Sequence, residues 1–379
     1  MNKRYGIGIV GCGMISAFHA KAIADMKSAR LVGIFSRSAE KGNRFAEANH
    51  CRAFTDFNEF LRCDGLDIVA IATPSGRHLE PALAAARAGK HILCEKPLEV
   101  TLERVDEIIR VCAECKVGLS GIFPRRFNGA VETAKRAVEA GRLGKLTLAS
   151  AYIKWHRTQA YYDSELWRRT WELSGGGALM NQSIHTIDLL LHLAGDVACV
   201  HAFADCAGHG GIEVEDVAMA ILRFKNEAMG TIEGTTTAYS ATGHPAQVQL
   251  CGTEGSIFLT DNRLTVWDFK TASADDAEIM TKYGAQAVAK GAGAADPKAI
   301  DYTEHLRNFE DFVASLDAGR LPKINGPESR RAVELILAIY ESAMNSGKSV
   351  SLPLKKSPTL RSLGGAPDSQ PPRRRDGEG

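Results

Sequence analysis

The run IGIV at residues 7–10 leads directly into GCGMIS at residues 11–16. This order predicts a strand, a sharp turn and the first turn of a helix. The two glycines let the backbone turn tightly and approach a pyrophosphate, and the N–H groups at the start of the helix would point at its phosphates. The pattern therefore indicates a βαβ unit that binds a dinucleotide. The contacts expected here are Gly11, Gly13, Met14 and Ile15.

The literal pattern G-x-G-x-x-G also fits Gly6, Gly8 and Gly11, but that register would place the turn inside the predicted strand. We therefore take the register that begins at Gly11 and puts Ser16 in the third small position. Because serine is larger than glycine, we expect the helix and the strand to lie slightly further apart there.

Length and composition narrow the class of protein. A chain of 379 residues predicts two domains, and a net charge of +1 argues against a nucleic-acid binder. No run of about twenty apolar residues occurs, so we expect no transmembrane helix and no membrane partner. The nine cysteines are scattered, and the one C-x-x-C lies in a helical pattern without a second pair. We therefore expect free thiols in a reducing cytoplasm and no metal site.

Strand and helix patterns alternate through the first 123 residues. Nearly continuous apolar strands separated by amphipathic helices are typical of a parallel sheet covered on both faces. We therefore predict an α/β, doubly wound Rossmann domain that binds a dinucleotide over residues 1–123. Further strands are expected at 31–35, 66–72, 91–94 and 117–123, and helices at 39–48, 79–88 and 101–115.

The pattern changes after residue 123 and predicts an α+β domain over residues 124–353 with a large, open, mainly antiparallel sheet. An Ala-, Gly- and Asp-rich excursion is expected at 271–300. Residues 354–379 are rich in Pro, Gly, Ser and Arg and predict a disordered tail. Strands are expected at 145–154, 197–204, 217–224, 228–237 and 247–250, and helices at 178–193, 303–316 and 329–344.

Glu95-Lys96-Pro97 follows the predicted strand at 91–94. In a doubly wound sheet the carboxyl ends of the strands face the ligand crevice, which places Lys96 beside a bound nicotinamide. The proline can fix the turn through a cis peptide bond. The alternative is an ordinary Glu–Lys pair at a surface turn.

Three glycines at 175–177 open the predicted helix that carries Asn181, His185 and Asp188. These residues stand at i, i+4 and i+7, so one helix face carries all three. Because the helix is otherwise apolar, an inward-facing polar site is favoured over a purely structural histidine.

Aromatic and arginine side chains are frequent between residues 155 and 171. Aromatic faces with nearby guanidinium groups suit a sugar ring and its hydroxyls, although tryptophans packed in a core would give the same composition. His305 is equally compatible with a structural role. The candidate substrate contacts are Arg125, Arg126, Trp155, His156, Tyr161, Trp167, Arg168 and His305.

The end of the second predicted strand bears on the choice between NAD and NADP. An acidic residue there would bind the ribose 2′-hydroxyl and favour NAD. The chain instead has Ser36 and Arg37, with Lys41 nearby. A small hydroxyl and a guanidinium suit a 2′-phosphate, so we expect NADP to be favoured over NAD.

Several segments carry a family pattern together: GCGMIS, ATPSGRH at 72–78, CEKP at 94–97, YYDSELWRRTW at 161–171 and GGGALMNQSIH at 175–185. RLP at 320–322, Gly326 and AIYESA at 338–343 close it. The chain thereby resembles the glucose–fructose oxidoreductase/inositol dehydrogenase/MocA (Gfo/Idh/MocA) family of NAD(P)-dependent oxidoreductases. The resemblance extends to about residue 353.

The resemblance implies a Rossmann domain followed by a domain with a large open sheet, and NAD(P)-dependent oxidation or reduction of a hydroxyl of a sugar or cyclitol. It implies that Lys96 contacts both the cofactor ribose and the reacting oxygen, and that His185 lies at the catalytic centre. The family commonly has Asp where this chain has Asn181, and asparagine cannot take a proton. Further cofactor contacts are implied at Thr73, Pro74, His78, Glu95, Lys96 and Arg168.

We therefore expect His185, with an ordinary pKa near about 6.5, to move the hydroxyl proton. The Lys96 cation would stabilise alkoxide charge by about 3 kcal/mol, and Asn181 would at most orient a hydroxyl. Two alternatives use the same motifs: a glycosidase or lyase that keeps its nucleotide bound and acts through transient oxidation, and a non-catalytic nucleotide-sensing regulator. An open sheet must cover one face, so we expect a homodimer or homotetramer.

Overall fold

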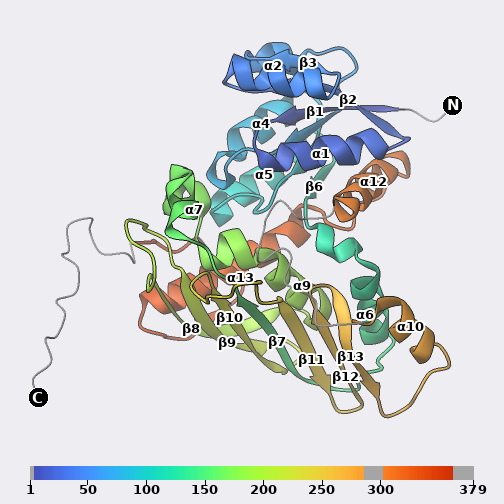
Figure 1. The fold of residues 1–379 in the computed structure, drawn as a ribbon, viewed down its shortest axis with the longest axis vertical. Coiled ribbons are helices and arrows are strands. Elements are labelled where there is room, and N and C mark those ends of the chain that lie inside the picture. The colour runs from blue at the N-terminus through green and yellow to red at the C-terminus, as the bar shows by residue number, and fades with distance from the viewer. Residues whose placement is uncertain (1–3, 286–301, 362–379) are drawn as a thin grey trace, which may run out of the picture.

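The computed structural model describes residues 4–285 and 302–361, and these residues form two sheets joined by helices (Figure 1). The first sheet has six parallel strands in the order β3-β2-β1-β4-β5-β6, which is the doubly wound order predicted for residues 1–123. Its strands are β1 (Tyr5–Val10), β2 (Ala29–Phe35), β3 (Arg52–Phe54), β4 (Ile68–Ile71), β5 (His91–Cys94) and β6 (Leu119–Gly121).

Helices cover both faces of this sheet. Ile7 and Ile9 of β1 point into a core that also contains apolar residues of α1 and α12, whereas Val69 and Ile71 of β4 point into the core on the other face. The helices of this part are α1 (Met14–Asp25), α2 (Ala39–Ala48), α3 (Phe57–Leu61), α4 (Leu79–Arg87), α5 (Leu102–Glu114) and α12 (Thr303–Asp317).

Helix α12 departs from the predicted domain division. The sequence assigned it to the second domain, but Phe309 and Phe312 share the core of Ile7 and Ile9. The reason is that the outer face of β1 needs a second helix beside α1, and the chain supplies it from a segment far along the sequence. The N-terminal unit is therefore completed by residues beyond 123.

The second sheet has eight strands in the order β13-β12-β11-β7-β10-β9-β8-β14. It is mainly antiparallel, as predicted, with one parallel pair between β7 and β10. The strands are β7 (Leu146–Lys154), β8 (Val197–Asp205), β9 (Val217–Phe224), β10 (Met229–Thr235), β11 (Gln247–Gly252), β12 (Gly255–Thr260), β13 (Arg263–Phe269) and β14 (Val350–Ser351). The hairpin of β12 and β13 was not predicted.

Within residues 4–285 and 302–361, helices cover one face of this sheet. Helices α9 (Ile184–Ala194) and α13 (Gly326–Met344) lie between it and the first sheet, and α6 (Gly129–Glu139) lies at its edge (Figure 1). The opposite face carries large apolar side chains that are exposed, among them Phe203 at 70% and Ile221 at 64%. The described residues contain no helix long and apolar enough to cross a membrane.

Two predicted irregular segments are partly ordered. The excursion at 271–300 contains α10 (Asp276–Tyr283), while its residues 286–300 lie outside the described residues. Residues 354–361, which were predicted to belong to a disordered tail, are part of the described structure. The N–H of Leu102 donates to Ser357 and the indole N–H of Trp171 donates to the carbonyl of Arg361. Residues 362–379 lie outside the described part.

A buried ion pair fixes α9 to the segment after β6. The guanidinium of Arg126 donates to both carboxylate oxygens of Asp188, at 2.6 and 2.8 Å, and also to Glu328 at 2.8 Å. Asp188 therefore does not join Asn181 and His185 in a polar site, and Arg126 does not face a substrate as the sequence suggested. Both side chains are occupied inside the protein.

Substituting Asp188→Asn should destabilise the protein by about 3 kcal/mol, because it leaves the buried Arg126 cation with only one carboxylate. Urea unfolding followed by circular dichroism measures the change. Lys145→Met, which breaks the exposed Lys145–Glu227 pair, is the control and should leave the midpoint unchanged. Equal midpoints for wild type and Asp188→Asn would contradict the assignment.

Candidate functional site

The turn between β1 and α1 is built for close approach by a ligand. Gly11 has φ +106°, and a Cβ there would lie 2.6 Å from the carbonyl oxygen of Ala72. A Cβ on Gly13 would meet nothing within 4 Å, so the space in front of the helix is open. No side chain caps the 12-residue helix α1 and its first turn has no acidic residue. Its N-terminal N–H groups therefore fit a phosphate.

Ser16, in the third small position, also makes a hydrogen bond within the glycine turn. Its side chain is fully buried and its hydroxyl donates to the carbonyl of Gly11 at 2.9 Å. Gly6 and Gly8 lie within β1, which agrees with the chosen register.

The end of β2 is arranged around three polar residues. Ser38 caps α2 by accepting the N–H of Lys41, and Ser36 accepts the N–H of Ser38. The carbonyl of Lys41 accepts from the thiol of Cys12, so α2 begins beside the glycine turn. Arg37 is exposed and makes no ion pair within residues 4–285 and 302–361. It remains available to a ligand at this edge.

Lys96 connects the two halves of the molecule. It follows β5, and its peptide bond to Pro97 is cis. The Nζ of Lys96 donates to the backbone carbonyl of Asn181 at 2.9 Å. Burial lowers the pKa of Lys96, the Glu95 carboxylate raises it and the Arg125 cation lowers it further. The ammonium is therefore held at the boundary between the Rossmann sheet and the glycine-led segment.

Glu95 and His78 hold the turn at Lys96-Pro97 through hydrogen bonds. The carboxylate of Glu95 accepts from Nε2 of His19 at 2.8 Å and from the N–H of Lys96 at 3.1 Å. Burial would raise the pKa of Glu95, but the His19 hydrogen bond and nearby cations bring it below its ordinary value. The buried ring of His78 contacts the carbonyls of Pro97 and Thr73 at 2.9 and 3.0 Å. Glu95 and His78 thus hold the loops, whereas the sequence placed both against the cofactor.

The glycine-led segment is not a regular α-helix. Residues Ala178–Ser183 form a π-helical turn, and α9 begins only at Ile184. The i, i+4, i+7 face inferred from the sequence is therefore interrupted. Gly176 has φ +148°, and a Cβ there would lie 2.1 Å from the Tyr340 hydroxyl; a Cβ on Gly177 would lie 2.1 Å from the carbonyl of Glu215. The glycines let the segment pass these neighbours.

His185 is the second residue of α9, and its ring is edge-on to Phe123 at 5.8 Å between centroids. Its Nδ1 is buried and has no partner among the described residues. Burial, together with the charges of Lys96, Arg125 and His305, holds the pKa of His185 well below 6.5. The expectation of an ordinary pKa is therefore corrected: the imidazole is neutral at neutral pH.

Arg125 and His305 complete the cationic surroundings of His185. A guanidinium N–H of Arg125 donates to the hydroxyl of Thr186 at 3.2 Å, and burial lowers the pKa of Arg125. His305 is 5% exposed on α12, with its ring centroid 6.1 Å from that of His19. His305 is therefore a buried neighbour of the site, packed beside His19, and we do not assign it to the substrate.

The aromatic stretch forms a wall beside Asn181. The guanidinium of Arg168 lies 4.2 Å from the ring centroid of Tyr161 and 5.6 Å from that of Trp167. Gln182 donates to the hydroxyl of Tyr161 at 2.7 Å and to the side-chain oxygen of Asn181 at 3.4 Å. Trp155 is 6% exposed and belongs to the core. Tyr161 and Trp167 are half-buried, which suits a binding surface.

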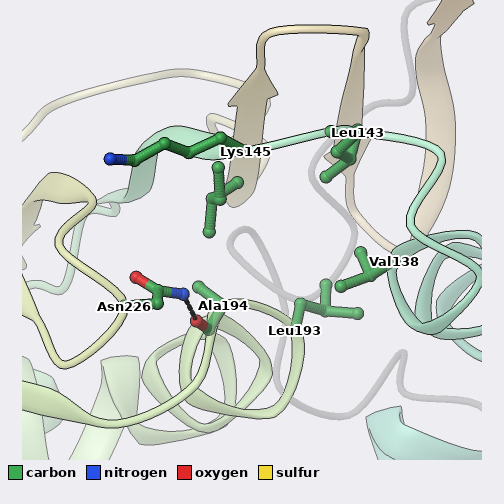
Figure 2. Close-up of a pocket in the computed structure, with 8 residues that line it drawn as sticks. Val138, Leu143, Lys145, Leu193, Ala194 and Asn226 are labelled. Carbon is green, nitrogen blue, oxygen red and sulfur yellow. Dashed lines mark hydrogen bonds between the residues drawn. The ribbon is translucent and has the colours of Figure 1, made fainter.

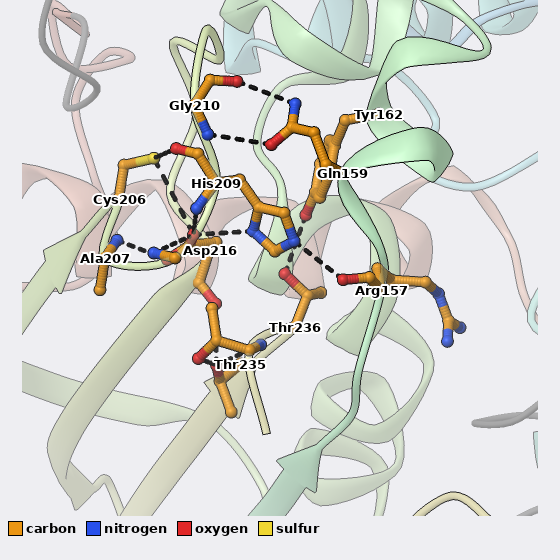
Figure 3. Close-up of polar contacts among 12 residues, drawn as sticks. Arg157, Gln159, Tyr162, Cys206, Ala207, His209, Gly210, Asp216, Thr235 and Thr236 are labelled. Atoms are coloured by element: carbon orange, nitrogen blue, oxygen red, sulfur yellow. Dashed lines mark hydrogen bonds and ion pairs between the residues drawn. The ribbon is translucent and has the colours of Figure 1, made fainter. Parts of the chain in front are cut away.

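A buried aspartate holds this wall in place (Figure 3). Asp216 accepts from the N–H groups of Ala207, Gly208 and His209 and from the His209 ring at 2.8 Å. The other ring nitrogen of His209 contacts the carbonyl of Arg157 at 2.8 Å. Burial would lower the pKa of His209, but the Asp216 hydrogen bond raises it above its ordinary value. Sequence reasoning missed this pair.

Sequence reasoning also missed the roles of His19 and Glu215. His19 stands on α1 directly after the glycine turn, but nothing in the sequence links it to Glu95, 76 residues away. Glu215 precedes β9 and nothing marks it as a partner of the glycine-led segment. Contacts of this kind depend on tertiary packing.

A separate hollow of about 320 Å³ lies at the far end of the second sheet (Figure 2). It contains none of the candidate site residues, and two of its side chains, Lys145 and Asn226, are strongly polar. The amide of Asn226 donates to the carbonyl of Ala194 at 2.9 Å. The lining residues are Val138, Leu143, Gly144, Lys145, Leu146, Leu193, Ala194 and Asn226.

Comparison with known proteins adds two family matches. Residues 5–121 match the family described as "Oxidoreductase family, NAD-binding Rossmann fold", and residues 131–258 match the "GFO/IDH/MocA C-terminal domain". The two matches fall on the two sheets.

Individual proteins of this family are also similar to the chain over most of its length. The levoglucosan dehydrogenase of Pseudarthrobacter phenanthrenivorans is 30% identical over 328 residues, which cover 77% of this chain and 83% of that protein. The scyllo-inositol 2-dehydrogenase (NAD(+)) of Bacillus subtilis is 29% identical over 95% of this chain and 99% of its own length. Among solved structures, the WlbA dehydrogenase of Bordetella pertussis, in complex with NADH and UDP-GlcNAcA, has a TM-score of 0.83 and 31% identity, covering 94% of this chain and 99% of that one.

Proposed function

The chain belongs to the GFO/IDH/MocA family of oxidoreductases, and from this premise we propose that it oxidises or reduces a secondary hydroxyl or ketone of a sugar, sugar derivative or cyclitol with a nicotinamide cofactor. The observation that carries the proposal is the 2.9 Å hydrogen bond from the Lys96 ammonium to the carbonyl of Asn181, beside His185. It supports the proposal because the Lys96 ammonium of the first half contacts the segment of the second half that leads to His185.

The Rossmann half fits a dinucleotide. The open space before Gly13 and the uncapped N-terminus of α1 would hold the pyrophosphate, and Met14 and Ile15 begin that helix. Thr73 and Pro74 follow β4, so they would lie at the same carboxyl edge of the sheet. When bound, the nicotinamide accepts a hydride from the sugar carbon or supplies one to it. Residues of this chain would accept the hydroxyl proton and stabilise the negative charge that develops on the oxygen.

His185 is suited to take the hydroxyl proton. Its imidazole is neutral because of burial and the Lys96 charge, so it can accept a proton in the oxidation direction. The Lys96 cation is suited to stabilise the alkoxide charge that develops, a contact worth about 3 kcal/mol in comparable sites. The side chain of Asn181 bonds to Gln182 and would orient a hydroxyl without exchanging a proton. Arg125, Tyr161 and Trp167 are the groups we assign to the substrate, with Arg168 behind them.

Substituting Lys96→Ala or His185→Ala should each lower kcat by at least about 10², because each removes a contact made to the reacting oxygen. Binding of reduced nicotinamide, measured by its fluorescence, should change by no more than a few-fold. His192→Gln, on the same helix, is the matched control and should keep wild-type turnover. Turnover of His185→Ala within a few-fold of wild type would remove His185 from the mechanism.

A panel of sugars, sugar acids and cyclitols with NAD and NADP identifies the reaction, read by the absorbance of reduced nicotinamide. A dehydrogenase produces one reduced cofactor for each substrate consumed. Consumption of a glycoside without net reduction, with the nucleotide retained by the protein, would instead identify the glycosidase or lyase alternative. Nucleotide binding without turnover of any substrate would identify the non-catalytic, nucleotide-sensing regulator.

For the cofactor we infer NADP over NAD. The end of β2 offers the hydroxyl of Ser36, the exposed guanidinium of Arg37 and, at the start of α2, Lys41. The nearest carboxylate along the chain, Glu40, is paired with Arg44 at 2.6 Å. A guanidinium without a carboxylate partner at this edge favours binding of a 2′-phosphate over a 2′-hydroxyl.

Substituting Arg37→Ala should reduce the preference for NADP, taken as the ratio of kcat/KM for NADP to that for NAD, by at least about tenfold, because the phosphate loses its charged partner. Steady-state kinetics with both cofactors measures the ratio. Arg44→Ala, which removes an exposed arginine of the neighbouring helix α2, is the control. The same ratio in wild type and Arg37→Ala would defeat the assignment.

We also infer a homo-oligomer, of which a homodimer is the simplest form. The uncovered face of the second sheet exposes apolar side chains on four neighbouring strands, which is unusual for a monomer. A second copy offers the same surface and would cover it around a two-fold axis. The side chains are Leu148, Phe203, Met219, Ile221 and Met229.

Substituting Ile221→Glu should convert the oligomer to a smaller species, because it places a charge within the apolar face. Light scattering coupled to size exclusion gives the mass. Leu321→Glu replaces an equally exposed apolar side chain that follows α12, and it should leave the mass unchanged. A monomeric wild-type protein would contradict the inference.

A further inference from the structure

Glu215 caps the glycine-led segment from the loop that precedes β9. Its carboxylate accepts the N–H of Gly177 at 2.9 Å and the N–H of Leu179 at 2.7 Å, and its backbone carbonyl accepts the N–H of Ala178 at 3.0 Å. Three successive N–H groups of the π-helical turn are thus satisfied by one residue that lies 36 or more positions away. Gly177, which begins the turn, provides no side-chain cap of its own.

The carboxylate is buried without a cation. Glu215 is 0% exposed and makes no ion pair within the described residues. Its third donor is the hydroxyl of Tyr340 on α13, at 2.7 Å. The other titratable groups that face it are Tyr162 on α7 (Gln159–Asp163), Cys206 after β8 and the adjacent Asp216. None of these groups supplies a positive charge.

This arrangement has a cost in stability. Burial raises the pKa of Glu215 from 4.5 to about 7, although its three donors lower it. Because the pKa is raised in the folded state, the stability that Glu215 contributes is fully present below pH 4.5 and is lost as the pH rises through about 7. Asp216 differs, since its carboxylate has His209 as a partner.

A neutral side chain of the same shape would avoid this cost but could not make the same contacts. Both oxygens of Glu215 accept hydrogen bonds, Oε2 from Gly177 and Oε1 from Leu179 and Tyr340. Glutamine has one acceptor oxygen, and its NH₂ would face an N–H donor. Only the carboxylate accepts from both Gly177 and Leu179 while also accepting from Tyr340.

We propose that Glu215 is a positioning residue for the reaction, whose carboxylate fixes the segment Gly177–Ser183 so that the carbonyl of Asn181 receives the Lys96 ammonium and His185 faces the same point. The inference rests on the proposed function for its catalytic consequence. The anchoring itself depends only on the contacts of Glu215 with Gly177, Leu179 and Tyr340. A stabilising role alone would predict the opposite effect of charge removal on stability.

The test compares Glu215→Gln and Tyr340→Phe with wild type, using Glu227→Gln as a control on the exposed turn that ends β9. In Glu215→Gln the amides of residues 177–179 should exchange with deuterium at least about tenfold faster. The thermal midpoint at about pH 8 should equal or exceed that of wild type, since a buried charge is removed. Its kcat should fall at least about tenfold, with KM for the nucleotide within about twofold.

The pH profile provides a second readout. A loss of kcat below about pH 7 in wild type that is absent from Glu215→Gln assigns the decline to protonation of Glu215. The profile of Glu215→Gln should be flat there. In Tyr340→Phe, the lost donor should move the decline to higher pH, because hydrogen bonds to the ionised form lower its pKa. Glu227→Gln should match wild type in every measurement.

Three outcomes overturn the proposal: wild-type amide exchange in Glu215→Gln, wild-type kcat together with faster exchange, or a midpoint that falls in parallel with kcat. The last outcome would mark Glu215 as a structural residue only. If Glu215→Gln does not fold, the shift of the pH profile in Tyr340→Phe decides. Exchange and midpoint need no substrate, so they judge the anchoring even where wild type lacks dehydrogenase activity and the proposed function fails.

Discussion

The hydrogen bond from the Lys96 ammonium to the carbonyl of Asn181 is the contact on which the rest of the molecule depends. Lys96 stands at the carboxyl edge of the parallel sheet, and Asn181 stands on a segment packed against the second sheet. The bond therefore joins the half that fits a dinucleotide to the half that presents His185. It also brings the positive charge that, with burial, keeps the His185 imidazole neutral. One contact thus sets both geometry and protonation.

Buried charges behind this contact hold each partner in place. His19 and Glu95 fix the Lys96 turn from α1, Glu215 fixes the segment that carries Asn181, and Asp216 with His209 fixes the aromatic wall. Each is expensive to bury, and each holds a loop that no regular hydrogen-bond ladder would hold. Close packing also explains Gly176 and Gly177, where a Cβ would collide with Tyr340 and Glu215 respectively. Burying these groups therefore costs folding free energy, and the cost falls on the loops that carry the candidate site.

Local signals in the sequence predicted much of the fold. The helix predicted at 39–48 and the strand predicted at 91–94 match α2 and β5 residue for residue. The β12–β13 hairpin was missed although Asp261-Asn262 is a turn signal, with φ of +44° and +63°. Long-range pairing could not be foreseen: Asp188 was assigned to the site but bonds Arg126, and His78 was assigned to the cofactor but bonds two backbone carbonyls. The π-helical turn also broke the helical spacing used to group Asn181 with Asp188.

A double-mutant cycle on Lys96 and His185 tests the central claim most directly, with single-turnover rates measured for wild type, both alanine variants and the double variant. If the two side chains act on the same reacting atom, the double variant should lose little more than the worse single variant, because either loss already disables the shared step. Losses that multiply across the cycle would show two independent sites and would contradict the account.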